Sequence, residues 1–325
     1  MIEKIAVIGA GGWGTTLANL LAEKSEVSLW VREKELVDVI KKEGENKFFL
    51  PGIKLNKNIN ISNSLEIAKD KEMVVMAVPT QFTRQTTKNI KEHIKKDTII
   101  VSVAKGLEIG TDKRISQILR EELGNDNILA LSGPNHCEEV SRRMPTATVI
   151  ASENMRLLKK VQPVFNRTYF KVYPHDDIVG VEFCGSIKNI TAIASGVVDG
   201  LGYGDNTKAS IITLGLTEMN NFSRHFGAKR ATIYGLAGVG DLVATCTSKH
   251  SRNRFVGEKL AEGISFEEIK KEMHGMVAEG VTTTKAVYEF SAKNNIKMPL
   301  TTQLYQVLYE EKDLKKAISD LIELI

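Results

Sequence analysis

The sequence predicts a doubly wound, mainly parallel α/β domain over residues 1–174, followed by an all-helical domain over residues 175–325. The first observation is that short β-branched runs alternate with helical or turn segments up to about Tyr173. The second is that long helical segments then follow without strands between them. A length of 325 residues also exceeds what one hydrophobic core usually supports, so two domains are expected.

The expected elements follow from residue periodicity. The strands are short apolar runs, as in a sheet buried on both faces, and are expected at residues 4–9, 26–31, 73–78, 98–103, 128–132 and 146–151. The first helix begins near Trp13, where leucines take up helical spacing. In the second domain the helical patterns cover residues 181–198, 207–226, 254–260 and 282–293.

Composition excludes several classes of protein. The 44 basic and 40 acidic residues leave a net charge of +4, without the concentrated basic surface of a nucleic-acid-binding protein. Three widely spaced cysteines suit a reducing compartment, and indicate neither a disulfide framework nor a metal site. No signal peptide is visible and no apolar run approaches the ~20 residues of a membrane span, so we expect a cytoplasmic protein.

A glycine-rich motif follows the first strand. Residues 9–14 read G-x-G-x-x-G, with glycines that permit a tight turn, approach of a pyrophosphate and packing of helix on strand. Its position between a strand and a helix predicts a Rossmann dinucleotide site shaped by Gly9, Gly11 and Gly14, in which the N-terminus of the helix offers its free N–H groups to the phosphates. The alternative is a glycine-rich turn without a ligand.

Arg32 bears on which nicotinamide cofactor is bound. It follows the second strand, where NAD-selective folds place an acid for the ribose hydroxyls. A guanidinium there can pair with a 2′-phosphate, which favours NADPH over NADH. The adjacent Glu33 leaves NADH open, and Arg32 as an ordinary surface residue is the alternative.

Lys188 stands in a helical run with two distinct faces. One face is an apolar stripe formed by Phe183, Ile187, Ile190, Ala194 and Val197. The other is formed by Cys184, Lys188, Thr191 and Ser195. Because an unpaired buried charge is unfavourable, Lys188 is expected to meet a ligand, a carboxylate or a cleft, and desolvation would lower its pKa toward the range useful for proton transfer. The alternative is a lysine that extends to solvent.

Two later segments carry further polar groups. Asp241 ends the glycine-dense run 235–241 and either orients Lys188 or caps the helix that follows. Thr245 lies in that helical turn. Residues 251–253, a serine, an arginine and an asparagine, present donors suited to a phosphate dianion, with a polar loop as the alternative.

Two strands of the first domain are followed by residues that could contact a ligand. Lys105 follows the strand at residues 98–103, and residues 132–135 follow a later one, so both lie at the carboxyl edge where open α/β sheets bind ligands. His136 is adjacent, but beside Glu138 and Glu139 it is typical of a surface group, and we assign it no role.

Together these segments resemble the bacterial-type NAD(P)-dependent glycerol-3-phosphate dehydrogenases over essentially the whole chain. The similar stretches occur in one order: GAGGWGTTLA from Gly9, ENKFFLPGI from Glu45, AVPT from Ala77, SVAKGLE from Ser102, SGPNHCEEV from Ser132, GVEFCGSIKNITAIASGVVDGLGYGDNTKA from Gly180, GLAGVGDLVATCTSKHSRN from Gly235 and VAEGVTTTKA from Val277. So many motifs in one order make the resemblance highly specific.

The resemblance implies roles for named residues. Lys188 would be the proton-transferring lysine, with Asp241 and Lys105 as its catalytic companions. The triose phosphate would be contacted by Lys105, Gly133, Asn135, Asp241, Ser251, Arg252 and Asn253, to which we add Lys188, Asn189 and Thr245. The cofactor would be lined by Gly12, Trp13, Arg32, Phe49, Lys105, Cys137, Arg252, Val277 and Glu279.

The chain departs from the family pattern at four positions. Asn135 stands where serine is usual and Cys137 where alanine is usual, both compatible with contacts made by the backbone. Phe49 replaces a tyrosine and loses only a hydroxyl. Leu214 replaces a common arginine, which would alter either the phosphate end of the site or the domain interface.

The expected activity is interconversion of dihydroxyacetone phosphate and sn-glycerol 3-phosphate with NADPH or NADH, feeding phospholipid synthesis. Lys188 would donate the proton to the developing alkoxide, and Arg252 with Asn253 would anchor the phosphate. A related dehydrogenase of another hydroxy acid and a non-catalytic NAD(P)H sensor are the rival functions. No metal is expected, and a homodimer is left open.

Overall fold

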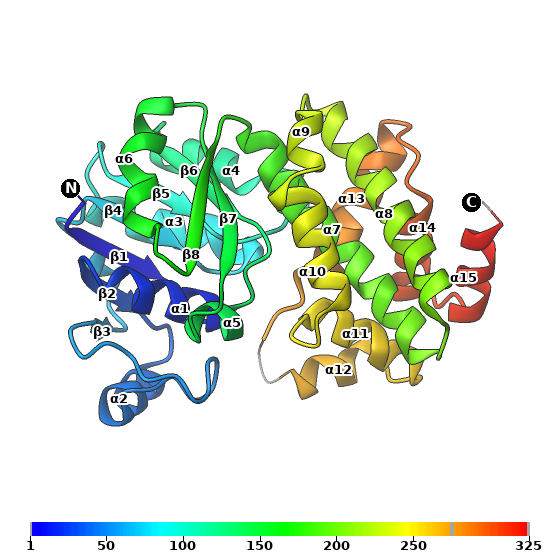
Figure 1. The fold of residues 1–325 in the computed structure, drawn as a ribbon, viewed down its shortest axis with the longest axis horizontal. Coiled ribbons are helices and arrows are strands. Elements are labelled where there is room, and N and C mark those ends of the chain that lie inside the picture. Colours follow the sequence, from blue (N-terminus) through cyan, green and yellow to red (C-terminus); the bar gives the residue numbers. More distant parts are fainter. Residues whose placement is uncertain (1, 274–275, 324–325) are drawn as a thin grey trace. The chain divides into compact units, whose positions relative to one another are not determined.

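The computed structural model describes residues 2–273 and 276–323, which form two compact units (Figure 1). The sheet unit takes in the residues up to Ala104 and from Ile115 to Ile178. The helical unit takes in Lys105–Arg114 and the chain from Val179 onward. This confirms the predicted fold class, an α/β unit with an all-helical unit after it. A single break after residue 174 does not describe the division, because Leu107 is fully buried in the helical unit's core.

The sheet of the first unit contains eight strands within the described residues, in the order β3-β2-β1-β4-β5-β6-β7-β8. All neighbours run parallel except β6 and β7. Across the sheet, the strand numbers fall from β3 to β1 and then rise from β4 to β8. The strand order therefore reverses between β1 and β4, which is the switch point where doubly wound sheets bind ligands. The strands are β1 (Lys4–Ile8), β2 (Glu26–Trp30), β3 (Asn60–Ser62), β4 (Met73–Met76), β5 (Ile99–Ser102), β6 (Ile128–Ser132), β7 (Thr146–Ala151) and β8 (Phe170–His175).

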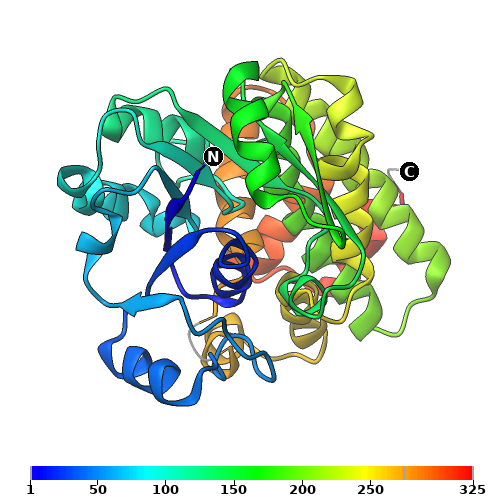
Figure 2. The same cartoon turned by 60° about the vertical axis from the view of Figure 1, so that its left-hand side comes forward.

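Helices cover both faces of this sheet, which explains why its central strands are apolar throughout (Figures 1 and 2). Alternate residues of β1 show this: Ile5 and Val7 belong to one core cluster, whereas Ala6 and Ile8 belong to another. Helices α1 (Gly12–Leu21), α2 (Lys34–Glu43) and α6 (Met155–Phe165) pack on the first cluster. Helices α3 (Thr80–Ile90) and α4 (Ile115–Leu123) pack on the second, and the short α5 (Cys137–Ser141) follows β6.

Two edge strands, β3 and β8, were not predicted. β3 has only three residues, too few for a periodic signal. β8 contains Pro174, which lacks an N–H donor and is therefore tolerated at the edge of a sheet. The strand continues through Pro174 to His175, so residue 174 lies within the sheet rather than at the end of the unit.

The helical unit is organised around α7 (Ile178–Gly200), which is buried along almost its whole length. The N-terminal half of α7 supplies Phe183, Ile187 and Ile190 to the main core cluster, and its C-terminal half supplies Ala194 and Val197 to a second one. The other helices are α8 (Asp205–His225), α9 (Arg230–Ile233), α10 (Asp241–Thr247), α11 (Arg252–Ala261), α12 (Phe266–Glu272), α13 (Glu279–Lys293), α14 (Pro299–Tyr309) and α15 (Leu314–Ile322). Of the helices in the described ranges, none is long and apolar enough to cross a membrane.

Leu214, one of the four positions at which the sequence departs from the pattern it resembles, has a packing role here. It lies on α8 and packs against the second core cluster of the helical unit, beside residues of α7 and α15. Leu300, Ile318 and Leu321 belong to the same cluster. An apolar side chain therefore suits this position, and Leu214 contributes to the apolar surface on which α15 packs.

Candidate active site

The glycine loop after β1 combines structural glycines with one that leaves open space. Gly9 has a φ of +116°, and a Cβ there would lie 2.8 Å from the carbonyl group of Ala77. A Cβ at Gly14 would collide with the carbonyl oxygen of Gly9, because α1 packs directly on the strand end. Gly11 differs, since its φ is −65° and no atom lies within 4 Å of the place a Cβ would take. The space at Gly11 is therefore available to a ligand.

The residues present fit the pyrophosphate of a dinucleotide. Gly11 caps α1 in extended conformation without a side-chain hydrogen bond, so the first N–H groups of the helix have no acceptor within the helix. A helix N-terminus of this kind favours phosphate through its free donors and its dipole. The loop also lies at the β1/β4 switch point of the sheet.

Two further residues predicted to line the cofactor lie against this loop. A Cβ at Gly12 would come within 2.8 Å of both the Cys137 sulfur and the Phe49 carbonyl oxygen. Cys137 begins α5, and its own carbonyl oxygen accepts a hydrogen bond from Thr16 at 3.4 Å. The structure thus brings Gly12, Phe49 and Cys137 together at the N-terminus of α1.

Asn46 is part of this arrangement and was missed in the sequence analysis. Its side chain is fully buried and donates to the Ala10 carbonyl oxygen and to Thr15 Oγ1, both at 2.9 Å. Its amide oxygen accepts from the Phe49 N–H at 3.3 Å. Asn46 therefore ties the segment that carries Phe49 to the glycine loop. The only sequence signal was its place in the ENKFFLPGI stretch.

Trp13 and Arg32 are placed differently around the loop. Trp13 packs against the Phe170 ring at 6.2 Å, and its buried indole nitrogen has no hydrogen-bond partner in the described part of the chain. Arg32 is largely exposed, and its Nε donates to the Glu33 carboxylate at 2.7 Å. A 2′-phosphate would therefore compete with Glu33 for this guanidinium.

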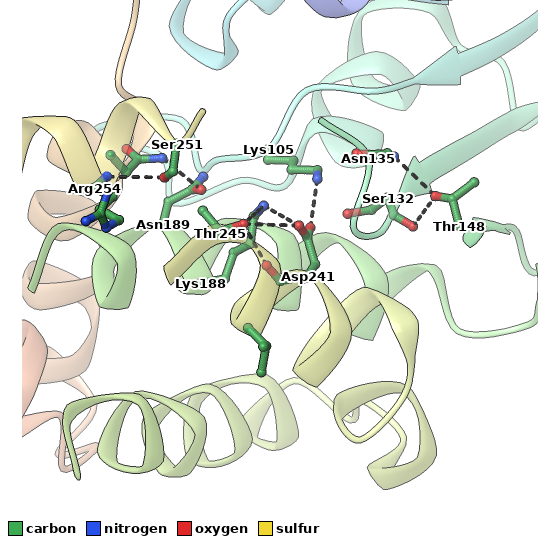
Figure 3. A network of polar contacts seen from close by, with 12 residues as sticks. Lys105, Ser132, Asn135, Thr148, Lys188, Asn189, Asp241, Thr245, Ser251 and Arg254 are labelled. Atoms are coloured by element: carbon green, nitrogen blue, oxygen red, sulfur yellow. Dashed lines mark hydrogen bonds and ion pairs between the residues drawn. The ribbon is translucent and has the colours of Figure 1, made fainter. Parts of the chain in front are cut away.

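A buried charge cluster forms the centre of the helical unit's site (Figure 3). Lys188, on α7, donates to the Asp241 carboxylate and, at 2.7 Å, to the Thr245 hydroxyl. Lys105 donates to the other oxygen of Asp241 at 2.7 Å. Two ammonium groups thus share one carboxylate whose side chain is only 2 % exposed. Lys188 is buried and bonded to a carboxylate, which is one of the three kinds of partner expected for it.

Burial and mutual charge set the ionisation of this cluster. Burial lowers the pKa of Lys188 to about 7, the Asp241 carboxylate opposes this shift, and the charge of Lys105 adds to it. Burial would raise the pKa of Asp241, but the charges of Lys105 and Lys188 outweigh it and hold that pKa below its usual value. At neutral pH, Asp241 is therefore ionised while Lys188 can both donate and accept a proton.

Asp241 is not the helix cap that the sequence left open. Gly240 occupies the N-cap position of α10, and Asp241 begins the helix with its carboxylate on the two lysines. The preceding residues, Leu236–Gly240, form a single turn of π-helix. Such turns are rare and often mark functional sites. The glycine-dense run leads into Asp241, whose side chain is buried.

The 251–253 segment is the start of α11 rather than a loop. Ser251 is the N-cap and accepts from the Arg254 N–H at 3.2 Å, and Arg252 follows as an exposed residue. Asn253 donates to Asn189 Oδ1 at 3.0 Å and accepts from the Gly280 N–H at 2.9 Å. This relay connects α7, α11 and α13, and leaves the Asn189 amide nitrogen as a donor.

The remaining predicted residues lie in both units. In the sheet unit, Asn135 donates to Thr148 Oγ1 at 3.2 Å, and that hydroxyl donates to the Ser132 carbonyl oxygen at 2.9 Å. Gly133 has a φ of +152°, and a Cβ there would meet the Thr148 hydroxyl at 2.7 Å. In the helical unit, Val277 precedes α13 and Glu279 begins it, both half-buried. The roles given to these residues stay predictions.

The first unit has a dinucleotide-type glycine loop on a doubly wound sheet, and the helical unit has a buried lysine–carboxylate cluster. These two features together define a class of nicotinamide-dependent dehydrogenases. Family models narrow this class. The N-terminal model of the NAD-dependent glycerol-3-phosphate dehydrogenases matches residues 4–158, and the C-terminal model matches residues 177–319. The chain belongs to the NAD-dependent glycerol-3-phosphate dehydrogenase family.

Individual relatives agree over nearly the full length. A glycerol-3-phosphate dehydrogenase [NAD(P)+] of Chlorobium limicola is 46% identical over 323 residues, covering 98% of this chain and 97% of the relative. One from Moorella thermoacetica is also 46% identical, covering 99% of this chain and 96% of the relative. The crystal structure of a glycerol-3-phosphate dehydrogenase from Coxiella burnetii is 38% identical, with a TM-score of 0.94 and 99% of each chain covered.

Proposed function

We propose that this chain interconverts dihydroxyacetone phosphate and sn-glycerol 3-phosphate with NADPH or NADH, and that Lys188 moves the proton. The observation that carries the proposal is the buried Lys188–Asp241 pair with Thr245 and Lys105 around it. Membership of the family supports the substrate. A pKa of about 7 for Lys188 supports proton transfer in both directions at neutral pH.

In reduction, the cofactor when bound supplies a hydride to C2 of the substrate. Lys188, as lysinium, donates its proton to the oxygen on C2 as negative charge develops there, and becomes the neutral amine. In oxidation the amine removes that proton. Asp241 and Thr245 orient the Lys188 nitrogen through their hydrogen bonds. The ammonium of Lys105 adds positive charge beside the reacting oxygen.

The phosphate is held at a distance from the reacting carbon by the start of α11. Arg252 supplies a guanidinium, Asn253 an amide, and Ser251 the cap that begins the helix. The Asn189 nitrogen, left as a donor by the Asn253 relay, serves the substrate hydroxyl or phosphate. Such remote contacts fix the orientation of C2 and so contribute to catalysis. We also assign Gly133 and Asn135 to contacts with the substrate.

The cofactor is assigned to the glycine loop and its neighbours. Gly9, Gly11, Gly12 and Gly14 shape the loop, and Trp13, Phe49 and Cys137 surround it. We also assign Lys105, Arg252, Val277 and Glu279 to the cofactor. We further propose that the enzyme is cytoplasmic, a compartment in which cysteines stay reduced, and that it supplies glycerol 3-phosphate for phospholipid synthesis. A homodimer stays a prediction.

An assay of cofactor oxidation tests this function. We expect the purified chain to oxidise NADPH or NADH, followed by loss of absorbance at the dihydronicotinamide band, when dihydroxyacetone phosphate is added. The phosphate-free analogue dihydroxyacetone should react far less efficiently, because it loses the orienting contacts at α11. Turnover with 2-keto acids and none with dihydroxyacetone phosphate would instead identify a dehydrogenase of another substrate. Binding of cofactor without any turnover would indicate a sensor.

Arg32 should govern cofactor preference. The substitution Arg32→Ala removes the guanidinium. It is expected to weaken NADPH binding by about 10- to 100-fold, the usual contribution of a hydrogen bond to a charged group. NADH, which lacks the 2′-phosphate, should be affected much less. Dissociation constants from dihydronicotinamide fluorescence measure both effects. Equal weakening of the two cofactors would show that Arg32 only packs on the adenine.

A further inference from the structure

The segment that carries Lys105 is a closed hairpin within the helical unit, although it follows β5 of the sheet directly. An antiparallel bridge joins Leu107 to Arg114, and the Glu108 N–H donates to the Lys113 carbonyl oxygen at 3.1 Å. Gly110 and Asp112 take positive φ values of 82° and 56° in its turn. Leu107 is fully buried in the core cluster of the helical unit. We call residues 105–114 the Lys105 hairpin.

A buried ion pair fastens this hairpin to α7. The Arg114 guanidinium donates to the Glu182 carboxylate at 2.6 Å, and the two side chains are only 11 % and 6 % exposed. The guanidinium also lies over the Phe183 ring, 5.6 Å from its centroid. A buried pair of this kind adds little net stability, but leaving one partner alone is unfavourable, so its geometry is strongly enforced.

The geometry of the hairpin connects this pair to the active site. Arg114 bridges to Leu107, and Lys105 lies two residues before Leu107 with its ammonium on Asp241 at 2.7 Å. A lysine side chain is long and flexible, so its ammonium keeps one position only if the backbone beneath it is fixed. Glu182 lies six residues before Lys188 on the same helix. Helix α7 therefore sets the positions of both lysines that bond to Asp241: it carries Lys188 itself, and through Glu182 it holds the hairpin that carries Lys105.

We propose that Arg114 and Glu182 are positioning residues, which hold the Lys105 hairpin on α7 so that the Lys105 ammonium stays on Asp241 during the reaction. The inference rests on the proposed function, because it assumes that the Lys105–Asp241–Lys188 cluster performs proton transfer. The pair acts through Lys105 and touches no reacting atom. Breaking the Arg114–Glu182 pair therefore has the same kind of effect on the reaction as removing Lys105, but a smaller one.

The ionisation of Lys188 provides a readout that general destabilisation would not move. Within the described residues, the titratable groups that interact electrostatically with the Lys188 ammonium are the Asp241 carboxylate, the Lys105 ammonium and the Cys246 thiol. Positive charge on Lys105 lowers the pKa of Lys188, so displacing Lys105 should raise it. The decline of reductive kcat/KM with rising pH should then begin at a higher pH.

The test is a double-mutant cycle on the full-length chain. Arg114→Gln is expected to lower kcat/KM for dihydroxyacetone phosphate by up to about 10²-fold, the effect of a misplaced catalytic group, and to move the pH profile upward. Lys105→Ala should lower kcat/KM further and move the profile in the same direction. Adding Arg114→Gln to Lys105→Ala should change neither quantity again, because the pair acts only through Lys105. Arg114→Lys, which retains a cation, should recover part of the loss.

Controls separate the possible failures. Arg84→Gln breaks a comparable ion pair with Glu121 and Glu122 in the sheet unit and should leave kcat/KM unchanged. If Arg114→Gln does not fold, judged by its circular dichroism melt, Glu182→Gln takes its place in the cycle. A wild-type chain without dihydroxyacetone phosphate turnover would refute the proposed function. An active wild type with multiplicative losses in the double variant, or with an unmoved pH profile, would overturn this inference alone.

Discussion

Replacing Lys188 with alanine is expected to lower kcat for dihydroxyacetone phosphate reduction by about 10²–10⁴-fold, the typical worth of a positioned proton donor. The substitution removes the buried group whose nitrogen is bonded to Asp241 and Thr245. It leaves Asp241 with the Lys105 ammonium, so the carboxylate keeps a partner and the site is not left with an unpaired charge. Steady-state kinetics with saturating NADPH measure the effect.

The controls for this variant address cofactor binding and folding. NADPH affinity should be nearly unchanged, because the predicted pyrophosphate site is the glycine loop of the sheet unit. Lys71→Ala is the matched variant: Lys71 is a largely buried lysine paired with Glu26, and its loss should leave kcat intact. A Lys188→Ala enzyme with a kcat close to wild type would contradict the assignment of Lys188.

Replacing Gly11 with valine is expected to abolish binding of NADPH and NADH. The backbone of Gly11 is extended and the space beside it is empty, so the chain itself accommodates a side chain there. That side chain would fill the approach of the pyrophosphate to the N-terminus of α1. Fluorescence titration of either cofactor measures the loss, and a thermal melt should show a nearly unchanged fold.

Gly204→Val is the matched control for this prediction. Gly204 also caps a helix, α8, in extended conformation, with no atom within 4 Å of its Cβ position. A valine there carries the same penalties of propensity and exposure, yet should leave cofactor affinity unchanged. Undiminished affinity in Gly11→Val would mean that the glycine loop does not receive the pyrophosphate.

Much of the fold was predictable because its local signals agree with its packing. Central strands such as β1 and β4 are buried on both faces, and such strands have the continuous apolar sequences seen at residues 5–8 and 73–76. The glycine motif between β1 and α1 fixed the type of the first supersecondary unit. The long buried α7 was equally clear from its periodicity, although it begins three residues earlier than expected, at Ile178.

Other features depend on tertiary contacts that leave no periodic trace. The Lys105 hairpin belongs to the helical unit because of Leu107 and the Arg114–Glu182 pair, which no local pattern indicates. The antiparallel pairing of β6 with β7 is equally invisible in the strand sequences. Asn46 stabilises the glycine loop through side-chain hydrogen bonds across 36 residues of sequence. Propensity and spacing carry no information about such partners.

The sequence indicated which residues belong to the candidate site, but it said less about how they are arranged. The helical face of Lys188 indicated a buried ammonium, and the structure confirms that a carboxylate meets it. The sequence left Asp241 equally open as a helix cap, and only the structure places Gly240 in that position. Residues 251–253 had an alternative as a polar loop, whereas they form the capped start of α11.

If Lys188 moves the proton, its ionisation controls the chemical step, and the pH dependence of single-turnover hydride transfer tests this role most directly. With saturating NADPH and dihydroxyacetone phosphate, the wild-type rate should be flat at low pH and fall tenfold per unit above a pH of about 7, because lysinium is the donor. The oxidation rate should rise through the same pH, because it needs the neutral amine. In Lys188→Ala, transfer should be at least about 10²-fold slower, without that ionisation. A near-normal rate in Lys188→Ala, or the same ionisation persisting there, would contradict the account.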